Sequence, residues 1–165
     1  MILETDRLRL RELTLADAPF LLELMNEPAF IRNVADRGLR TTADVEHWMS
    51  ERILPSYTRH GFGFYLVELK ETGAPVGICG LIKREVLDHV DVGYSILTRH
   101  SGKGYAYEAA AAVIAYGRET LGLPRIIGVT SPMNPASIRI LEKLGLRFER
   151  MVKLPDFEKP SMLFG

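Results

Sequence analysis

The feature that most constrains this chain is the stretch ILTRHSGKGYAYEAA at residues 96–110. It is typical of the end of a strand, a short loop with glycines at 102 and 104, and the start of a helix. Alternate glycines leave backbone N–H groups uncovered, and the first helical turn adds unpaired N–H groups and the positive end of the helix dipole. A phosphate could therefore bind here without a dedicated basic side chain. The spacing alone leaves open the plainer alternative, a turn that simply needs glycine.

The composition is that of an ordinary globular protein. Its 165 residues suit one domain, spanning 1–165, and 47% of them are hydrophobic. The 21 basic residues balance the 21 acidic residues, which argues against nucleic-acid binding as the main role. The single cysteine, Cys79, excludes an intrachain disulfide and fits a reducing compartment. No signal-peptide core and no membrane-spanning apolar run is present, so we expect a cytoplasmic protein without a membrane partner.

Hydrophobic periodicity predicts an order in which strands and helices are mixed. Strands are predicted at 7–13, 62–70, 76–84, 89–97, 125–131 and 146–154, and helices at about 15–27, 43–59, 106–121 and 134–144. Residues 26–40 are expected to be largely irregular, and residues 155–165 to add at most a last edge strand. Hairpins that precede one crossover helix predict an α/β domain of the α+β type, with a mixed, mostly antiparallel sheet of six to seven strands and helices on both faces.

Two familiar phosphate-binding motifs do not match the glycine loop. A Walker A loop would need glycine at position 97 and Ser or Thr at 104, where the chain has Leu97 and Gly104. A dinucleotide fingerprint that starts at Gly102 would need Gly or Ala at position 107, which is Tyr107, and a parallel unit near the start of the chain.

The residues Arg99, Gly102 and Gly104 instead match Arg-x-x-Gly-x-Gly/Ala followed by a helix. This pattern resembles the acyl-CoA pyrophosphate loop of the GCN5-related N-acetyltransferase (GNAT) superfamily. GKGYAYEAAAAV at 102–113 and NPASIRILEKLGLRFER at 134–150 are similar to two signatures of its ribosomal-protein (RimJ/RimL-type) branch. The resemblance covers most of the chain. It implies a single GNAT-like domain and an acetyl-CoA-dependent N-acetyltransferase.

The resemblance also implies how acetyl-CoA would be held. Its pyrophosphate would bind backbone N–H groups of the loop, and its pantetheine arm would lie along the end of strand 89–97, which must separate from strand 125–131. A backbone N–H near Ile96 or Leu97 would bind the acetyl oxygen in the transition state. Lys103 could screen the charge of the phosphates from outside, and the alternative is that it is a solvated surface lysine. The implied cofactor-binding residues are Ile96, Leu97, Arg99, Ser101, Gly102, Lys103, Gly104, Tyr105, Ala106, Asn134 and Ser137.

The leaving thiolate needs a proton. Many family members carry a tyrosine for this in the last helix, but here Leu141 occupies that position. The resemblance to the ribosomal-protein branch implies Ser137 as the donor, with Asn134 binding the pantetheine arm or ordering a water. The alternative is that Asn134 and Ser137 only cap a short helix.

Candidates for the general base lie on strand 89–97. We rank Asp91 first, where the related branch often has an acidic residue, and His89 second, on the same face of the strand. Asp88, Glu85 and Glu68 are alternatives, and each of these could equally be an ordinary charged residue. A base could also act through water, or be absent if the amine arrives neutral. The four histidines and Cys79 lack metal-ligand spacing, so we expect no metal.

The acceptor should meet the variable region at residues 26–60. This region either lines the substrate groove together with Trp48, Tyr57 and Tyr65, or it forms a packed surface loop. The residues that would line the groove are Phe30, Ile31, Arg32, Asn33, Asp36 and Arg37. We expect direct transfer in a ternary complex to a primary amine, either a protein N-terminus or a small amine, and we leave a homodimer open. The alternative function is a non-catalytic module that binds CoA or a nucleotide and recognises a partner protein.

Overall fold

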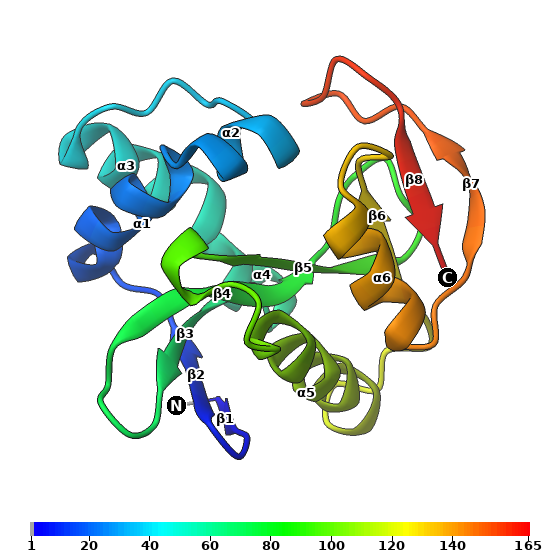
Figure 1. The fold of residues 1–165 in the computed structure, drawn as a ribbon, viewed down its shortest axis with the longest axis horizontal. Coiled ribbons are helices and arrows are strands. Elements are labelled where there is room, and N and C mark those ends of the chain that lie inside the picture. The colour runs from blue at the N-terminus through cyan, green and yellow to red at the C-terminus, as the bar shows by residue number, and fades with distance from the viewer. Residues whose placement is uncertain (1) are drawn as a thin grey trace.

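One mixed sheet runs through the computed structural model, which describes residues 2–165 (Figure 1). It has eight strands in the order β1-β2-β3-β4-β5-β6-β8-β7. Their bounds are Leu3–Glu4 (β1), Leu8–Glu12 (β2), Phe64–Leu69 (β3), Pro75–Ile82 (β4), Val90–Ile96 (β5), Ile126–Thr130 (β6), Phe148–Val152 (β7) and Ser161–Phe164 (β8). Only β5 and β6 pair in parallel, and every other neighbouring pair within residues 2–165 is antiparallel. The predicted mixed, mostly antiparallel sheet is confirmed.

Helices cover both faces of this sheet, as the sequence predicts. Their bounds are Ala18–Met25 (α1), Pro28–Asn33 (α2), Thr42–Trp48 (α3), Pro55–His60 (α4), Tyr105–Glu119 (α5) and Pro135–Lys143 (α6), with short turns at Leu15–Asp17 (η1) and Thr98–His100 (η3) and a π-helical segment at Met49–Ile53 (η2). In Figure 1, α1, α2 and α3 lie on one side of β4 and β5, and α5 lies on the other. None of the helices within residues 2–165 is both long and apolar enough to cross a membrane.

The alternation of side chains along the strands builds the two larger of three hydrophobic cores, and the third lies around Ile127 and Leu163. On β3, Tyr65 and Val67 pack in the cluster that contains Ala109 and Val113 of α5. Between them, Leu66 points the other way, into the cluster of α1 and α3. The sheet therefore separates an α5–α6 face from an α1–α4 face, and Tyr57 of α4 packs against the cluster of the α5–α6 face.

The predicted boundaries differ from the structure in four places. Residues 26–40 contain the helix α2, because Pro28 begins it rather than interrupting it. The predicted helix 43–59 is divided into α3, η2 and α4, and Pro55 stands at the first position of α4. The sheet has eight strands rather than six or seven, since β1 was not predicted. The tail strand β8 is internal, between β6 and β7, and β7 is the edge strand.

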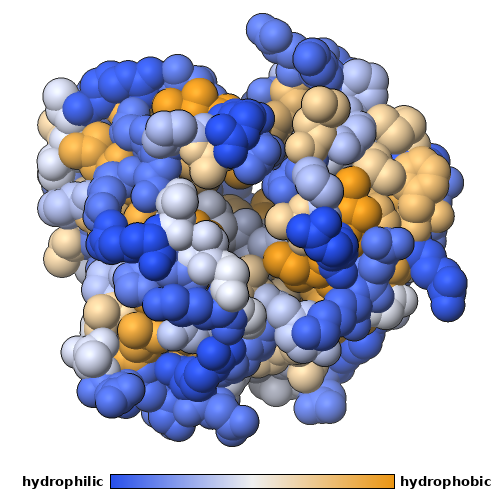
Figure 2. All heavy atoms as spheres, viewed as in Figure 1, coloured by the Kyte–Doolittle hydropathy of each residue, from blue (hydrophilic) through white to orange (hydrophobic). Residues whose placement is uncertain are grey.

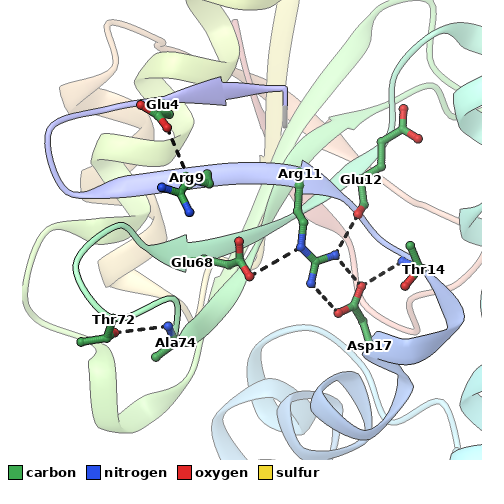
Figure 3. Close-up of polar contacts among 9 residues, drawn as sticks. All are labelled: Glu4, Arg9, Arg11, Glu12, Thr14, Asp17, Glu68, Thr72 and Ala74. Carbon is green, nitrogen blue, oxygen red and sulfur yellow. Dashed lines mark hydrogen bonds and ion pairs between the residues drawn. The ribbon is translucent and has the colours of Figure 1, made fainter.

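A network around Arg11 fixes the start of α1 on the sheet (Figure 3). Arg11 donates to both carboxylate oxygens of Asp17 at 2.8 and 2.9 Å, and its Nε lies 3.5 Å from Glu68 on β3. Burial raises the pKa of Asp17, but hydrogen bonds from Arg11 and from the Thr14 N–H outweigh burial and lower that pKa overall. A charged Asp17 therefore holds α1, β2 and β3 together on the α1–α4 face.

Candidate active site

The parallel strands β5 and β6 stay together for only three residue pairs. They pair from Val90 with Ile126 to Val92 with Gly128. Beyond this point β5 continues to Ile96 against β4, and β6 continues against β8. The two strands thus separate into a wedge, and Figure 2 shows the surface hollowed between the half that carries α1–α3 and the half that carries α6.

The end of β5 presents backbone groups to this wedge. The Leu97 N–H already donates to the Val76 carbonyl at 2.8 Å. The backbone N–H and C=O groups of successive residues point to opposite sides of a strand. The backbone groups of Ser95 and Leu97 therefore point to β4, and those of Tyr94 and Ile96 point into the wedge. Of the two predicted donors to the acetyl oxygen, the geometry favours the Ile96 N–H.

The glycine loop forms a cradle of free N–H groups above the wedge. Gly102 and Gly104 adopt φ angles of 76° and 83°, which only glycine adopts easily. The N–H groups of residues 102–104 find no acceptor within the described chain 2–165. The first helical bond runs from Glu108 N–H to the Gly104 carbonyl, so residues 105–107 have no helical partner for their N–H groups. A Cβ added at Gly102 would meet no atom within 4 Å, so the space beside the loop is open.

Arg7, which the sequence did not single out, clamps the loop to the start of α5. Its Nη1 donates to the Lys103 carbonyl at 2.9 Å, its Nε donates to Glu108 at 2.8 Å, and its guanidinium lies 4.6 Å from the centre of the Tyr105 ring. Burial raises the pKa of Glu108, but hydrogen bonds from Thr5 and Arg7 outweigh burial and lower it. Glu108 of the motif was the only sign of this contact in the sequence, because Arg7 comes from the turn between β1 and β2, near the other end of the chain.

The other flank of the loop is tied to α1 and to Glu27, which precedes α2. Arg99, the first residue of the motif, pairs with Glu23, and the Thr98 N–H donates to Glu27 at 3.0 Å. Ser101 donates its hydroxyl to the Thr98 carbonyl at 2.7 Å. Lys103 is exposed. Arg99 and Ser101 are thus engaged within the protein, whereas the Lys103 side chain has no hydrogen-bond or ion-pair partner among residues 2–165 and can meet a ligand or solvent.

The second motif lies on the far side of the wedge. Asn134 caps α6 by accepting a hydrogen bond from the Ser137 N–H at 3.2 Å. The Ser137 hydroxyl lies 3.0 Å from the Tyr94 hydroxyl on β5. Tyr94 was not among the predicted site residues, although it is the only aromatic residue of its strand. Burial raises the pKa of Tyr94 to about 12.

The two predicted bases lie apart from Ser137. Asp91 is three residues from Tyr94 on β5, so its side chain points to the α1–α4 face. It is buried, and its Oδ2 accepts a hydrogen bond from Arg84 at 3.0 Å, while its Oδ1 has no partner among residues 2–165. Burial raises the pKa of Asp91, although Arg84 opposes the rise. His89 lies about 16 Å from Tyr94 along the strand, and it lines a separate cavity of about 110 Å³ with Arg125 and Glu149.

A groove of about 430 Å³ lies on the α1–α4 face, and its lining includes Arg37, Trp48, Phe64, Ile82, Arg84 and Asp156. It meets β5 where this strand leaves β6. A Cβ added at Gly93, one residue past the last parallel pair, would lie 2.7 Å from Ile82 and 3.1 Å from Phe64. Ile82 and Phe64 line the groove and lie against Gly93. The groove therefore rests on β5, the strand that also borders the wedge.

The predicted acceptor residues divide among this groove, the cores and the surface, and the surface group is Ile31, Arg32, Asn33 and Asp36, which do not line the groove. Arg37 and Trp48 line the groove, with the Arg37 guanidinium 5.4 Å from the Trp48 ring. Phe30 is buried in the α1–α3 core, and Tyr65 is buried on the opposite face. The Tyr57 hydroxyl donates to the Phe64 carbonyl and accepts from the Leu13 N–H. Phe30, Tyr57 and Tyr65 therefore serve the fold.

A family model described as an acetyltransferase (GNAT) domain matches residues 7–147. The chain belongs to this family. It is 30% identical to an uncharacterized N-acetyltransferase, p20, of Bacillus licheniformis, over 95% of this chain and 87% of the relative. A solved acetyltransferase from Agrobacterium tumefaciens is 28% identical with a TM-score of 0.82, over 98% of this chain and 91% of that one.

A further GNAT structure supports the fold alone, because its identity is only 15%. It is RimL, a ribosomal L7/L12 α-N-protein acetyltransferase in complex with coenzyme A, with a TM-score of 0.84 over 99% of this chain and 95% of that one. As a GNAT enzyme the chain is an acetyl-CoA-dependent N-acetyltransferase, and its acceptor is an amine.

The residues present fit acetyl-CoA. Gly102 leaves open space where any other residue would place a Cβ, and the free N–H groups of the loop and of α5 suit a pyrophosphate. The Tyr94 and Ile96 backbone groups, which β6 leaves unpaired, suit an amide-bearing arm. Among residues 2–165, no three His, Cys, Asp or Glu side chains gather as metal ligands.

Proposed function

We propose that this N-acetyltransferase moves the acetyl group directly to a primary amine while donor and acceptor are bound together. Bound acetyl-CoA supplies an acetyl group that is activated as a thioester. The observation that carries the proposal is that Phe64 and Ile82 of the groove lie against Gly93 of β5, one residue past the point where β5 separates from β6 and the wedge begins. An amine in the groove and a thioester in the wedge would be separated by little more than the edge of one strand.

On the donor side, the N–H groups of Gly102, Lys103, Gly104, Tyr105 and Ala106 bind the pyrophosphate. The Ile96 N–H binds the acetyl oxygen, and it is already oriented by the β4–β5 ladder. The side chains of Arg99 and Ser101 hold the loop in place. Asn134 contacts the pantetheine arm and also fixes the helix turn on which Ser137, the proton donor, stands.

On the acceptor side, the groove admits a protein N-terminus or a small amine. Asp91 is the first candidate for the base, with His89 second. A covalent acetyl-enzyme is disfavoured because Cys79, the only cysteine of the chain, is fully buried and its pKa is raised by burial. Direct attack by the amine needs no nucleophile from the protein.

Titration calorimetry with acetyl-CoA, followed by an acceptor screen that measures free CoA, tests this proposal. We expect binding at tens of micromolar or tighter, and CoA release with at least one class of peptide N-terminus or small amine. An absence of acetyl-CoA binding would contradict the proposal. Binding without transfer to any acceptor would favour the non-catalytic module.

A further inference from the structure

A tyrosine and a serine meet across the wedge, from elements that are far apart in the sequence. Tyr94 stands on β5, two residues after the last pair with β6, and Ser137 stands in the first turn of α6. The Tyr94 hydroxyl donates to the Ser137 carbonyl at 3.2 Å and lies 3.0 Å from Ser137 Oγ, so its one proton can be shared between these two oxygens. Among residues 2–165, no other side chain is hydrogen-bonded to the Ser137 hydroxyl.

The contact with Tyr94 holds the hydroxyl of Ser137, whose backbone is already held by Asn134. The Asn134 carboxamide already accepts from the Ser137 N–H, which fixes the backbone of this residue. A serine hydroxyl rotates freely unless a neighbour holds it. Tyr94 is the neighbour that holds it, and the tyrosine itself is half-buried against the α5–α6 core.

The position of Tyr94 also bears on the tyrosine that many family members carry in the last helix and that this chain lacks. Position 141, where many family members carry a phenol, is Leu141, and its side chain is buried in the core. Tyr94 brings a phenol to the start of the same helix from the neighbouring strand. Its pKa of about 12 keeps it protonated and able to donate at neutral pH.

We propose that Tyr94 is a positioning residue for acetyl transfer, and that its hydroxyl orients Ser137 so that the serine proton faces the thioester sulfur. The inference rests on the proposed role of Ser137. As the C–S bond breaks and the C–N bond forms, Ser137 gives its proton to sulfur and regains one from water, while the amine releases its surplus proton to solvent. Tyr94 keeps its own proton throughout, because that proton is only shared in hydrogen bonds to Ser137 Oγ and to the Ser137 carbonyl.

A double-mutant cycle tests the inference. Tyr94→Phe, Ser137→Ala and the double variant are compared for kcat, for the KM and Kd of acetyl-CoA, and for Tm. We expect each single variant to lower kcat by about 10- to 100-fold with less than about a twofold change in Kd. The double variant should be no slower than Ser137→Ala, because the pair acts as a unit. Tyr116→Phe removes a hydroxyl of α5 that does not touch Ser137, and it should leave kcat unchanged.

Several results would overturn the inference. An unchanged kcat in Tyr94→Phe would make Tyr94 a packing residue, and additive losses in the double variant would make the two residues independent. A raised kcat in Tyr94→Phe would mean that the serine proton points at the phenol in the wild type. An unchanged kcat in Ser137→Ala would leave nothing for Tyr94 to orient.

Crystal structures of the CoA complexes of the wild type and Tyr94→Phe separate this inference from the proposed function, because they need no turnover. A Ser137 hydroxyl that faces sulfur only when Tyr94 is intact supports the inference. The same serine rotamer in both structures overturns it. If the wild type binds acetyl-CoA but releases no CoA with any acceptor, the proposed function has failed, and the two structures still decide the role of Tyr94.

Discussion

The proposed donor and acceptor sites on the two sides of β5 are built by different means. The donor side consists of backbone N–H groups and a few side chains, and most of it comes from two short stretches at 96–106 and 134–137. The acceptor groove consists of side chains from four separate segments, represented by Arg37, Trp48, Arg84 and Asp156. Backbone recognition tolerates sequence change as long as the loop keeps its shape, whereas side-chain recognition changes with each substitution. We therefore expect this enzyme to share its donor with its relatives and to have its own acceptor.

The largest expected effect concerns the loop glycines. Gly102→Val and Gly104→Val force a β-branched residue to a positive φ, so the loop must rearrange and turn its N–H groups away. Losing two charge-assisted hydrogen bonds of about 1.5 kcal/mol or more each should weaken acetyl-CoA binding by at least about 100-fold, measured by calorimetry.

Gly73→Val is the matched control for this prediction. Gly73 lies in the β3–β4 turn with a φ of 75°, and, like Gly102, it has no atom within 4 Å of an added Cβ. The control should lose a similar amount of stability but keep its affinity for acetyl-CoA. Equal affinity losses in all three variants would show that strain, not the cradle, governs binding.

A smaller effect is expected on the acceptor side. Trp48→Ala removes an aromatic wall of the groove, so the KM of the acceptor should rise by about tenfold, while the Kd of acetyl-CoA changes little. Phe148→Ala on β7 is the control, because Phe148 is a half-exposed aromatic residue outside the groove. A loss of donor affinity in Trp48→Ala as large as the rise in acceptor KM would mean that the two sides are not separate.

The smallest expected effect concerns stability, to which the carboxylates of Glu108 and Asp91 should contribute with opposite dependence on pH. The lowered pKa of Glu108 means that its charged form stabilises the fold above its ordinary pKa of about 4.3 and that this contribution is lost as pH falls toward the lowered value. The raised pKa of Asp91 means that its contribution is fully present below about 3.9 and is lost as pH rises through the raised value.

Urea unfolding from pH 3 to 7 measures how the contribution of each carboxylate to the free energy of unfolding changes with pH. The free energy of unfolding of the wild type minus that of Glu108→Gln should rise with pH, and the same difference for Asp91→Asn should fall. Slopes of the same sign would contradict the assigned environments of these residues.

Much of the fold was predictable because local patterns decide it. Strict alternation located β2 at 7–13, and the caps located α6 at 134–144. The strand β8 was hard to place because Met162, Leu163 and Phe164 are consecutive apolar residues without alternation, in a strand with neighbours on both sides. The helix α2 was missed because Pro28 is read as a breaker unless the helix start is known.

The candidate site was predictable where its parts are close in the sequence. Gly102 and Gly104 adopt the positive φ angles that their loop requires, and Asn134 caps Ser137 three residues later. Arg7 and Tyr94 could not be found in this way, since they meet their partners across 96 and 43 residues, respectively. The tertiary fold decides which strands and helices bring such residues together. The hydrophobic periodicity of the sequence does not contain this information. The acceptor groove has the same origin, which is why residues 26–60 alone did not define it.

Amide hydrogen exchange, followed residue by residue by NMR with and without acetyl-CoA, tests the donor site most directly. We expect acetyl-CoA to slow exchange at Ile96 and at residues 102–106, whose N–H groups face the wedge or the cradle. The Leu97 N–H should change little, because it is already bonded to Val76. Slowed exchange confined to the groove around Trp48 and Arg84, with no change at residues 102–106, would contradict the assignment of the wedge and the glycine loop to acetyl-CoA.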